Sequence, residues 1–148
     1  MKGYDYVIVG SGTAGSTLAA RLTEDPAARV LVLECGGPDR GFWLKLPVGY
    51  YKSIYDSRVS HLYRGEPDTG IADRSMDCPR GRVVGGSSSI NGLIYIRGQH
   101  QDFDRWQALG AEGWSFQDVL PYFRSIETYN GAPSQYRGGQ GPLHVSDL

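Results

Sequence analysis

Cysteine is scarce in this sequence. The chain of 148 residues contains two cysteines, Cys35 and Cys78. A disulfide framework in a small secreted domain uses more cysteines than this, and a metal motif places its ligands at close, regular spacing. Because these two residues are far apart in the sequence, we expect both to be free thiols, and we predict no metal site.

Excess charge and long hydrophobic runs are also lacking. The formal net charge is −1, so nothing indicates nucleic acid or an anionic membrane surface as a partner. No run approaches the ~18 apolar residues of a membrane-spanning helix. The N-terminus leads into a strand-like run without the features of a signal peptide. These absences favour a cytoplasmic protein with no clear membrane segment.

Glycine, by contrast, is abundant. The 21 glycines are about twice the ~7% average. They form two clusters, one in residues 10–15, here called the first glycine segment, and one in residues 79–98, the second glycine segment. Clustering of this kind indicates close contact between the backbone and a ligand rather than low complexity.

The first glycine segment lies inside a strand–turn–helix–strand pattern that covers residues 4–34. Residues 4–9 are apolar and β-branched, residues 13–23 carry apolar side chains at helical spacing, and residues 29–34 form a second apolar run. The right-handed crossover rule makes the two strands parallel. The pattern predicts an α/β fold that begins as a βαβ unit.

Within this unit the spacing G-x-G-x-x-G is typical of dinucleotide-binding folds. Gly10 permits a tight turn, Gly12 lets a pyrophosphate approach the backbone, and Gly15 lets the helix pack closely on the sheet. Glu34 follows at about the ~20 residues expected of the acid that binds the adenosine ribose. The alternative, a hairpin turn followed by an unrelated helix, leaves this acid unexplained. The motif by itself does not separate FAD from NAD.

The remaining segments are less regular. Residues 38–78 have poor periodicity and many tyrosines, which predicts a loop-rich excursion that packs on something. It either lines a substrate entrance or packs against another domain. Residues 100–127 carry two helical patterns, the second with Ser115 as its N-cap, and should form a helical cover. Residues 143–145 resemble the start of a strand.

The second glycine segment has the composition of a ligand cradle. Gly85 and Gly86 free backbone N–H groups to point at a ligand, residues 87–89 add hydroxyls, and Asn91 offers both a donor and an acceptor. Such a segment suits a phosphate or the edge of a flavin ring. A flexible Gly/Ser loop is the alternative, but it does not explain the apolar run that follows.

Residues 81–98 resemble the first signature of the glucose–methanol–choline oxidoreductases, a family of FAD-dependent enzymes. Residues 95–98, 102–106, 113–115 and 141–146 are similar to its bacterial alcohol dehydrogenase and choline dehydrogenase branch. The resemblance covers essentially the whole chain and favours FAD over NAD. It implies that residues 1–148 are the N-terminal part of a Rossmann-like FAD-binding domain, with the substrate domain absent from this chain.

The resemblance also implies which residues bind the cofactor. On the side of the adenosine and pyrophosphate these are Gly10, Gly12, Thr13, Ala14, Gly15 and Glu34, and on the flavin side Val84, Gly86, Ser87, Asn91, Gly92 and Ile94. Some family members tether the flavin through a histidine in the second motif. Ile90 stands at that position here, so we expect non-covalent FAD.

The implied reaction is oxidation of a primary alcohol to an aldehyde by hydride transfer to flavin N5. In the family, the histidine that takes the alcohol proton lies near the far C-terminus. We therefore expect the catalytic base outside this chain rather than at His61, His100 or His144. The expected partner is the C-terminal remainder of the enzyme as a separate chain. Two alternatives stay open, a non-catalytic nucleotide-binding module and a lyase or decarboxylase with the same fold.

Overall fold

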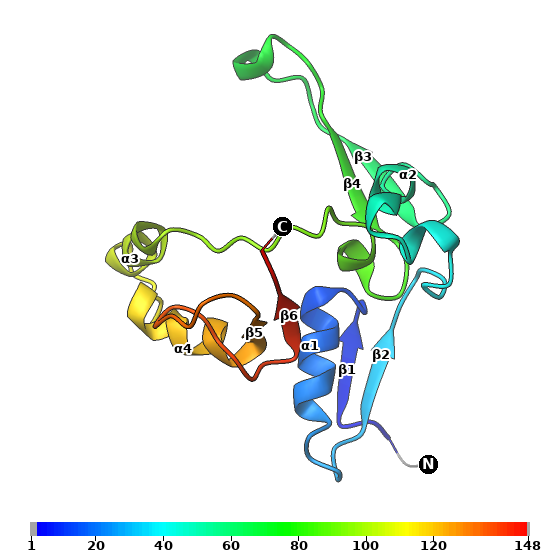
Figure 1. Ribbon diagram of the computed structural model, residues 1–148. Helices are drawn as coiled ribbons and strands as arrows, with labels where there is room; N and C mark the ends of the chain where they lie inside the picture. The colour runs from blue at the N-terminus through cyan, green and yellow to red at the C-terminus, as the bar shows by residue number, and fades with distance from the viewer. Residues whose placement is uncertain (1–2, 148) are drawn as a thin grey trace. The chain divides into compact units, whose positions relative to one another are not determined.

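The computed structural model describes residues 3–147. These residues mix helices with short strands (Figure 1). They divide into two compact units, Met1–Ile94 and Tyr95–Leu148. Both glycine segments begin in the first unit. The two helices predicted within residues 100–127 lie in the second unit.

The first unit is built around a parallel βαβ motif. Strand β1 (Tyr6–Val9) pairs in parallel with strand β2 (Val30–Leu33), and helix α1 (Thr13–Leu22) connects them. The helix lies alongside both strands (Figure 1), and Ile8 is the buried side chain of β1. The βαβ start predicted from the sequence is confirmed, with strands slightly shorter than their apolar runs.

The close packing of α1 depends on one glycine. A Cβ atom built on Gly15 would lie 2.0 Å from the carbonyl oxygen of Gly10 and 3.2 Å from Cγ2 of Ile8. No side chain fits at these distances. Helix α1 therefore reaches the turn and the strand before it only because residue 15 has no Cβ.

The stretch between β2 and the second glycine segment holds more regular structure than its periodicity indicates. It contains 3-10 helices at Phe42–Leu44, Pro47–Gly49 and Thr69–Ile71, helix α2 (Tyr50–Ser53), and an antiparallel hairpin of β3 (Ser60–Arg64) and β4 (Asp77–Gly81). The hairpin strands are rich in polar residues, and β4 contains Pro79. They lack the apolar alternation by which a strand is recognised in a sequence.

The second glycine segment folds against the βαβ motif. Val83 is fully buried and forms an isolated parallel bridge with Gly37. A Cβ atom on Gly36 would lie 2.2 Å from the backbone of Arg82, so the two stretches of chain are in direct contact. A 3-10 turn follows at Gly86–Ser89. The second glycine segment is thus placed just beyond the carboxyl end of β2, where α/β sheets bind their ligands.

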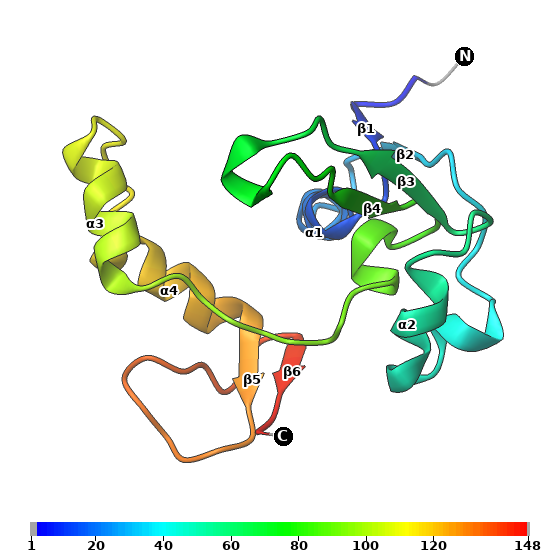
Figure 2. The same ribbon diagram turned by 90° about the horizontal axis from the view of Figure 1, so that it is seen from above.

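The second unit joins two helices to a small parallel sheet. Helix α3 (His100–Ala108) and helix α4 (Phe116–Ile126) lead into β5 (Glu127–Tyr129), which pairs in parallel with β6 (Leu143–Val145). Figure 2 shows the two strands side by side at the end of α4. Phe103 of α3 is buried and belongs to the core of this unit.

Both helices of the second unit begin at capping boxes. At α4 the Ser115 hydroxyl accepts a hydrogen bond from the backbone N–H of Asp118 at 3.2 Å, and the Asp118 carboxylate accepts one from the Ser115 N–H at 3.1 Å. Gln99 and Asp102 form the corresponding pair at α3. The N-cap predicted at Ser115 is therefore present, and it satisfies backbone donors that the helix leaves free.

Removal of the Ser115 cap should destabilise the second unit measurably. Ser115→Ala leaves an N–H group at the start of α4 without its partner, and we expect a loss of about 1 kcal/mol in the free energy of unfolding. Thermal denaturation followed by circular dichroism measures this as a lower Tm. Ser146→Ala, at an exposed serine outside any helix, is the matched control and should leave the Tm unchanged.

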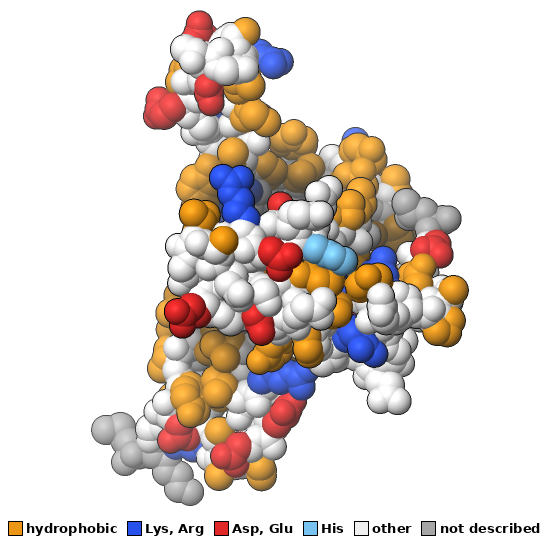
Figure 3. All heavy atoms as spheres, turned by 90° about the vertical axis from the view of Figure 1, so that its left-hand side faces the viewer, with side chains coloured by type: hydrophobic (Ala, Val, Ile, Leu, Met, Phe, Trp, Pro, Cys, Tyr) orange, Lys and Arg blue, Asp and Glu red, His pale blue; other side chains and the backbone are white. Residues whose placement is uncertain are grey.

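Large apolar side chains are exposed on both units. Val9 of β1 is 85% exposed, and Ile94 and Ile96 are 75% and 83% exposed. Figure 3 shows hydrophobic side chains at many points of one face. In the described residues the sheet of β1 and β2 has two strands, so one edge of β1 has no partner strand there. Apolar exposure on this scale marks surfaces that contact other protein or a ligand.

Two further features concern membranes and metals. None of the helices within residues 3–147 combines the length and the apolar character needed to span a bilayer. The same residues contain no cluster of three or more histidine, cysteine, aspartate or glutamate side chains placed to hold a metal ion. Cys35 and Cys78 are both free thiols, as expected.

Candidate dinucleotide-binding site

The turn between β1 and α1 leaves the start of the helix open. Gly10 has φ +95°, a left-handed conformation that favours glycine, and its N–H donates to the Leu33 carbonyl oxygen at 2.7 Å. Gly12 is the N-cap of α1; no side chain caps the helix, and its first turn has no acidic residue. The first N–H groups of α1 and the positive end of its dipole therefore suit an anion such as a pyrophosphate.

The two glycine segments meet at this turn. The Gly85 N–H donates to the carbonyl oxygen of Ser11 at 3.1 Å. Gly86 has φ +58°, and a Cβ atom there would lie 2.8 Å from Cα of Gly12. Residue 86 must lack a side chain for the two backbones to come this close. The contact joins segments that are far apart in the sequence into one surface, as a single extended cofactor requires.

Glu34 follows β2 directly, and its carboxylate lies against the same turn. Oε2 accepts hydrogen bonds from the N–H and the hydroxyl of Ser11, both at 2.8 Å, and Oε1 accepts one from the Gly36 N–H at 2.8 Å. These bonds, foremost the one from the Ser11 backbone, lower the pKa of Glu34 to about 2. The carboxylate is ionised at neutral pH. It can accept one more strong donor, such as a ribose hydroxyl.

The stability of the first unit should depend on the ionisation of Glu34. Its pKa in the folded state, about 2, lies below the ordinary 4.5. The stabilising contribution is therefore complete above about pH 4.5 and is lost as the pH falls towards 2. We expect Glu34→Gln to be less stable than the natural protein at neutral pH, with a difference that shrinks in acid. Urea unfolding at a series of pH values measures this, and a difference independent of pH would contradict it.

The residues predicted on the flavin side surround the turn Gly86–Ser89. The Ser87 hydroxyl accepts a hydrogen bond from the last backbone N–H of β4 at 3.0 Å, and Asn91 Oδ1 accepts one from the N–H two residues later at 2.9 Å. Val84 and Ile94 are 44% and 75% exposed. The polar groups thus shape the local backbone, while the two apolar side chains are open to a ligand or to further protein.

The aromatic excursion packs against this segment. Trp43 and Tyr50 line a cavity of about 190 Å³ together with Ser88 and Asn91. A Cβ atom on Gly92 would come within 3.8 Å of the Tyr50 ring. The expectation that the excursion packs on something is met by these contacts. Its aromatic side chains lie beside the residues assigned to the flavin side. Whether they line a substrate entrance or pack against another domain stays a prediction.

The predicted residues form two groups in the structure. One group converges on the β1–α1 turn and consists of Gly10, Gly12, Gly15, Glu34 and Gly86, with Thr13 and Ala14 exposed in the first turn of α1. The other group lies near Tyr50 and includes Asn91 and Gly92. Sequence reasoning missed Ser11, which forms hydrogen bonds with Glu34 and Gly85, because the x positions of G-x-G-x-x-G are read as spacers.

The three histidines have ordinary structural contacts. His61 lies on β3, with its ring centroid 4.2 Å from that of Tyr63. His100 stacks on Phe116 at 3.5 Å between ring centroids, and His144 is exposed on β6. The two in the second unit are thus engaged at the start of α3 and in the small sheet. That the catalytic base lies outside this chain stays a prediction.

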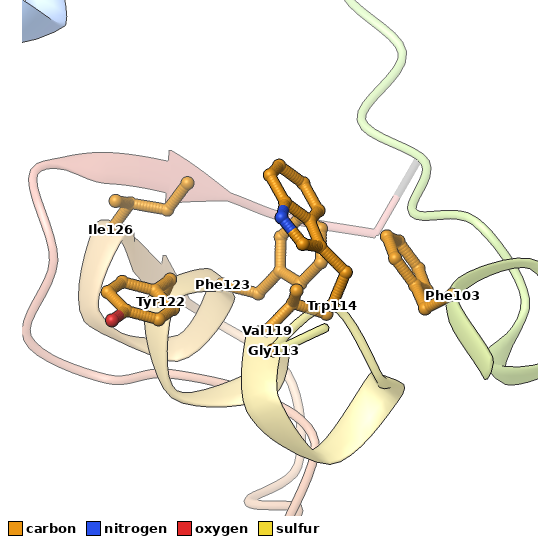
Figure 4. Close-up of a pocket in the computed structure, with 7 residues that line it drawn as sticks. All are labelled: Phe103, Gly113, Trp114, Val119, Tyr122, Phe123 and Ile126. Carbon is orange, nitrogen blue, oxygen red and sulfur yellow. The ribbon is translucent and has the colours of Figure 1, made fainter. Parts of the chain in front are cut away.

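A second concave surface lies in the second unit. The groove has a volume of about 500 Å³ and is lined by Phe103, Gly113, Trp114, Val119, Tyr122, Phe123 and Ile126. Figure 4 shows these side chains coming from α3, from α4 and from the segment between them. The lining contains no carboxylate, imidazole or amine, so it offers no general acid or base apart from the phenol of Tyr122.

Comparison with known proteins decides the family. A model of the GMC (glucose–methanol–choline) oxidoreductases matches residues 4–148. The chain belongs to this family. The GMC match therefore covers both units and both glycine segments, and it confirms the resemblance found from residues 81–98.

The GMC relatives include several bacterial enzymes. Oxygen-dependent choline dehydrogenase of Sinorhizobium medicae is 49% identical over 141 residues, which are 95% of this chain and 26% of that protein. The enzyme of the same name from Photobacterium profundum is 46% identical over 140 residues, 95% of this chain and 25% of that protein. The chain thus spans about a quarter of the length of the curated relatives it matches.

Solved structures of GMC-type enzymes share the fold. Pyridoxine 4-oxidase from Mesorbium loti superposes with a TM-score of 0.88 at 38% identity, over 96% of this chain and 28% of that one. Aspergillus oryzae formate oxidase gives 0.82 at 32% identity, over 97% and 26%. A fungal aryl-alcohol oxidase gives 0.75 at 30% identity, over 99% and 27%. These matches confirm the predicted α/β fold of a GMC N-terminal region.

Proposed function

We propose that this chain is the FAD-binding N-terminal portion of a flavin-dependent oxidoreductase that oxidises a primary alcohol to an aldehyde. The observation that supports it most is the meeting of the two glycine segments at the uncapped start of α1, beside the ionised Glu34. This surface combines N–H donors and a helix dipole for phosphates with a carboxylate for a ribose. The residues present therefore fit FAD.

The chain's own residues then bind and orient the cofactor. The residues assigned to the pyrophosphate are Gly10, Gly12, Thr13, Ala14 and Gly15, with Glu34 on the ribose and Val84, Gly86, Ser87, Asn91, Gly92 and Ile94 on the flavin side. FAD supplies the hydride acceptor, N5 of its ring, and the protein supplies position and electrostatics. Ile90 is buried and apolar, so it offers no atom for a covalent tether, which supports non-covalent binding.

The names of the relatives support the substrate class. Choline and aryl alcohols carry a hydroxyl group, and proteins named for them are 49% and 30% identical to this chain. The proposal is accordingly an enzyme that acts on CH–OH groups of a small molecule. A cytoplasmic location agrees with the two free thiols, because oxidising compartments favour disulfides.

We propose that the substrate domain and the catalytic base lie in the C-terminal remainder of the enzyme, beyond the region that this sequence covers. The coverage of about a quarter of each relative supports this. So does β1, whose apolar residues Val7 and Val9 are 57% and 85% exposed. Strands that are apolar on both faces are typical of the interior of a larger parallel sheet.

Flavin spectroscopy of the co-purified complex tests the proposed function. The chain is expressed with an affinity tag together with the C-terminal part, and the eluate is analysed for FAD and for partner protein. We expect bound FAD that is released by acid and bleached anaerobically by one or more primary alcohols. FAD that no alcohol reduces would favour the non-catalytic module, and a chain that recovers neither FAD nor ADP would end the proposal.

A further inference from the structure

Ser11, the x residue between the first two glycines, is a junction of three segments. Its N–H and hydroxyl both donate to Oε2 of Glu34 at 2.8 Å. Its carbonyl oxygen accepts from the Ser16 hydroxyl at 2.7 Å and from the Gly85 N–H at 3.1 Å. Four hydrogen bonds thus tie this residue to the end of β2, to α1 and to the second glycine segment. Ser11 itself is 9% exposed.

The hydroxyl is the part of this junction that depends on the side chain. Every residue except proline supplies an N–H and a carbonyl oxygen at position 11, whereas the second donor to Oε2 of Glu34 comes from the serine hydroxyl. With two donors, Oε2 has both of its acceptor positions filled. Oε1 has one strong donor, the Gly36 N–H at 2.8 Å, and a weak one, the Cys35 thiol at 3.6 Å.

Because the donors on the two oxygens differ in strength, Oε1 and Oε2 of Glu34 are not equally available to a ligand. A thiol is a weak donor and is readily replaced by a hydroxyl. The open acceptor position of Glu34 is therefore on Oε1, and the Ser11 hydroxyl keeps it there by holding Oε2 in place. Without that hydroxyl, one position opens on Oε2 as well. The carboxylate, still held by the Ser11 and Gly36 N–H groups, then offers two open acceptor positions instead of one.

We propose that Ser11 is a positioning residue of the dinucleotide site, whose hydroxyl saturates one oxygen of Glu34 and reserves the other for a ribose hydroxyl of the adenosine half. The proposal rests on the proposed function, since it assigns a partner within the same cofactor site. It makes position 11 a determinant of how strongly the site distinguishes an adenosine ribose with hydroxyls from one without.

The test compares two ligands on the full chain. Isothermal titration calorimetry measures the Kd of ADP and of an ADP analogue whose ribose lacks both hydroxyls. We expect the natural protein to prefer ADP by roughly tenfold, the value of one hydrogen bond to a charged group. In Ser11→Ala this preference should fall below about threefold, because the open acceptor position of Glu34 is no longer confined to Oε1. Ser11→Thr keeps the hydroxyl and should restore the preference.

A matched control and a second variant keep the outcome decisive. Ser57→Ala removes a hydroxyl from an exposed position in the same unit and should leave both Kd values unchanged. Ser11→Cys keeps the side-chain size but offers only a weak donor. If Ser11→Ala does not fold, Ser11→Cys replaces it in the test and should show the same loss of preference for ADP.

Two outcomes would count against the role of Ser11, and a third would count against the proposed function. An unchanged preference for ADP in a folded Ser11→Ala protein overturns it, because Oε2 then serves the ribose equally well. Failure of both the alanine and the cysteine variants to fold overturns it too, since the serine is then purely structural. If the natural protein binds neither ligand, the proposed function itself has failed, which is a distinct result.

Discussion

Glu127→Ala is expected to unfold the second unit at temperatures where the natural protein is folded. The Glu127 side chain is fully buried and pairs with Arg97, whose side chain is 12% exposed, and with Arg137 at 3.4 Å. Removal of the carboxylate leaves two guanidinium groups facing each other without a counter-charge. Loss of one partner from a buried ion pair costs about 3–5 kcal/mol, which is a large part of the stability of a small domain.

The measurement is chemical unfolding, followed by the fluorescence of the tryptophans in this unit. Glu112→Ala, which removes an exposed glutamate from the same unit, is the matched control and should change the free energy of unfolding very little. Glu127→Gln keeps an acceptor for Arg97 but no charge, and should fall between the two. A Glu127→Ala protein as stable as the Glu112→Ala protein would show that the ion-pair triad of Glu127, Arg97 and Arg137 contributes nothing to the free energy of unfolding.

The triad also determines the course of the chain in this unit. Arg97 donates to the carbonyl oxygens of Tyr136 and Phe123 as well as to Glu127. A Cβ atom on Gly141 would lie 2.1 Å from the Glu127 backbone nitrogen, so the loop before β6 runs directly over this residue. The buried charge thus holds β5, α4 and the loop before β6 to the segment that enters α3.

Local patterns account for the parts of the fold that the sequence predicts well. The βαβ start, the cap at Ser115 and the helices of residues 100–127 each depend on side chains within a few residues of one another. The periodicity and capping rules describe interactions of this kind. The resemblance of residues 81–98 to the GMC signature was specific for the same reason, because the residues that carry it are contiguous.

The features that escaped prediction depend on contacts between distant residues. Glu127 meets Arg97 and Arg137 only after the chain has folded around it, and no local pattern marks a glutamate as buried. Ser11 reads as a spacer until Glu34 is placed beside it. The hairpin of β3 and β4 lacks apolar alternation, since four of the five residues of β3 are exposed. Within residues 3–147 its two strands form a sheet of their own.

The contact between the glycine segments combines local patterns, which the sequence shows, with a long-range contact, which it does not show. Each segment is recognisable alone from its composition, but their separation in the sequence says nothing about distance in space. The hydrogen bond from Gly85 to Ser11 and the close approach of Gly86 to Gly12 supply that missing information. A cofactor that spans both segments therefore has a continuous backbone surface to lie on, and changes at the point of contact should affect the whole of it.

Gly86→Ala is the substitution expected to damage that surface most. The added Cβ atom would lie 2.8 Å from Cα of Gly12, closer than two non-bonded carbon atoms approach each other. The φ angle at this position is +58°. A left-handed backbone alone costs a residue with a side chain about 1–2 kcal/mol. Separation of the two segments would also move the N-terminus of α1 away from the flavin side. We expect FAD binding to weaken on the order of 100-fold, equivalent to about 2.8 kcal/mol.

A neighbouring glycine separates this effect from the general cost of replacing glycine by alanine. A Cβ atom on Gly37 meets nothing within 4 Å, and its φ lies outside the left-handed region. Gly37→Ala should therefore bind FAD as the natural protein does, with flavin fluorescence quenching as the measurement for both variants. Equal affinities in Gly86→Ala and Gly37→Ala would mean that the two segments need not touch for the cofactor to bind, and the geometry argued for the site would then be wrong.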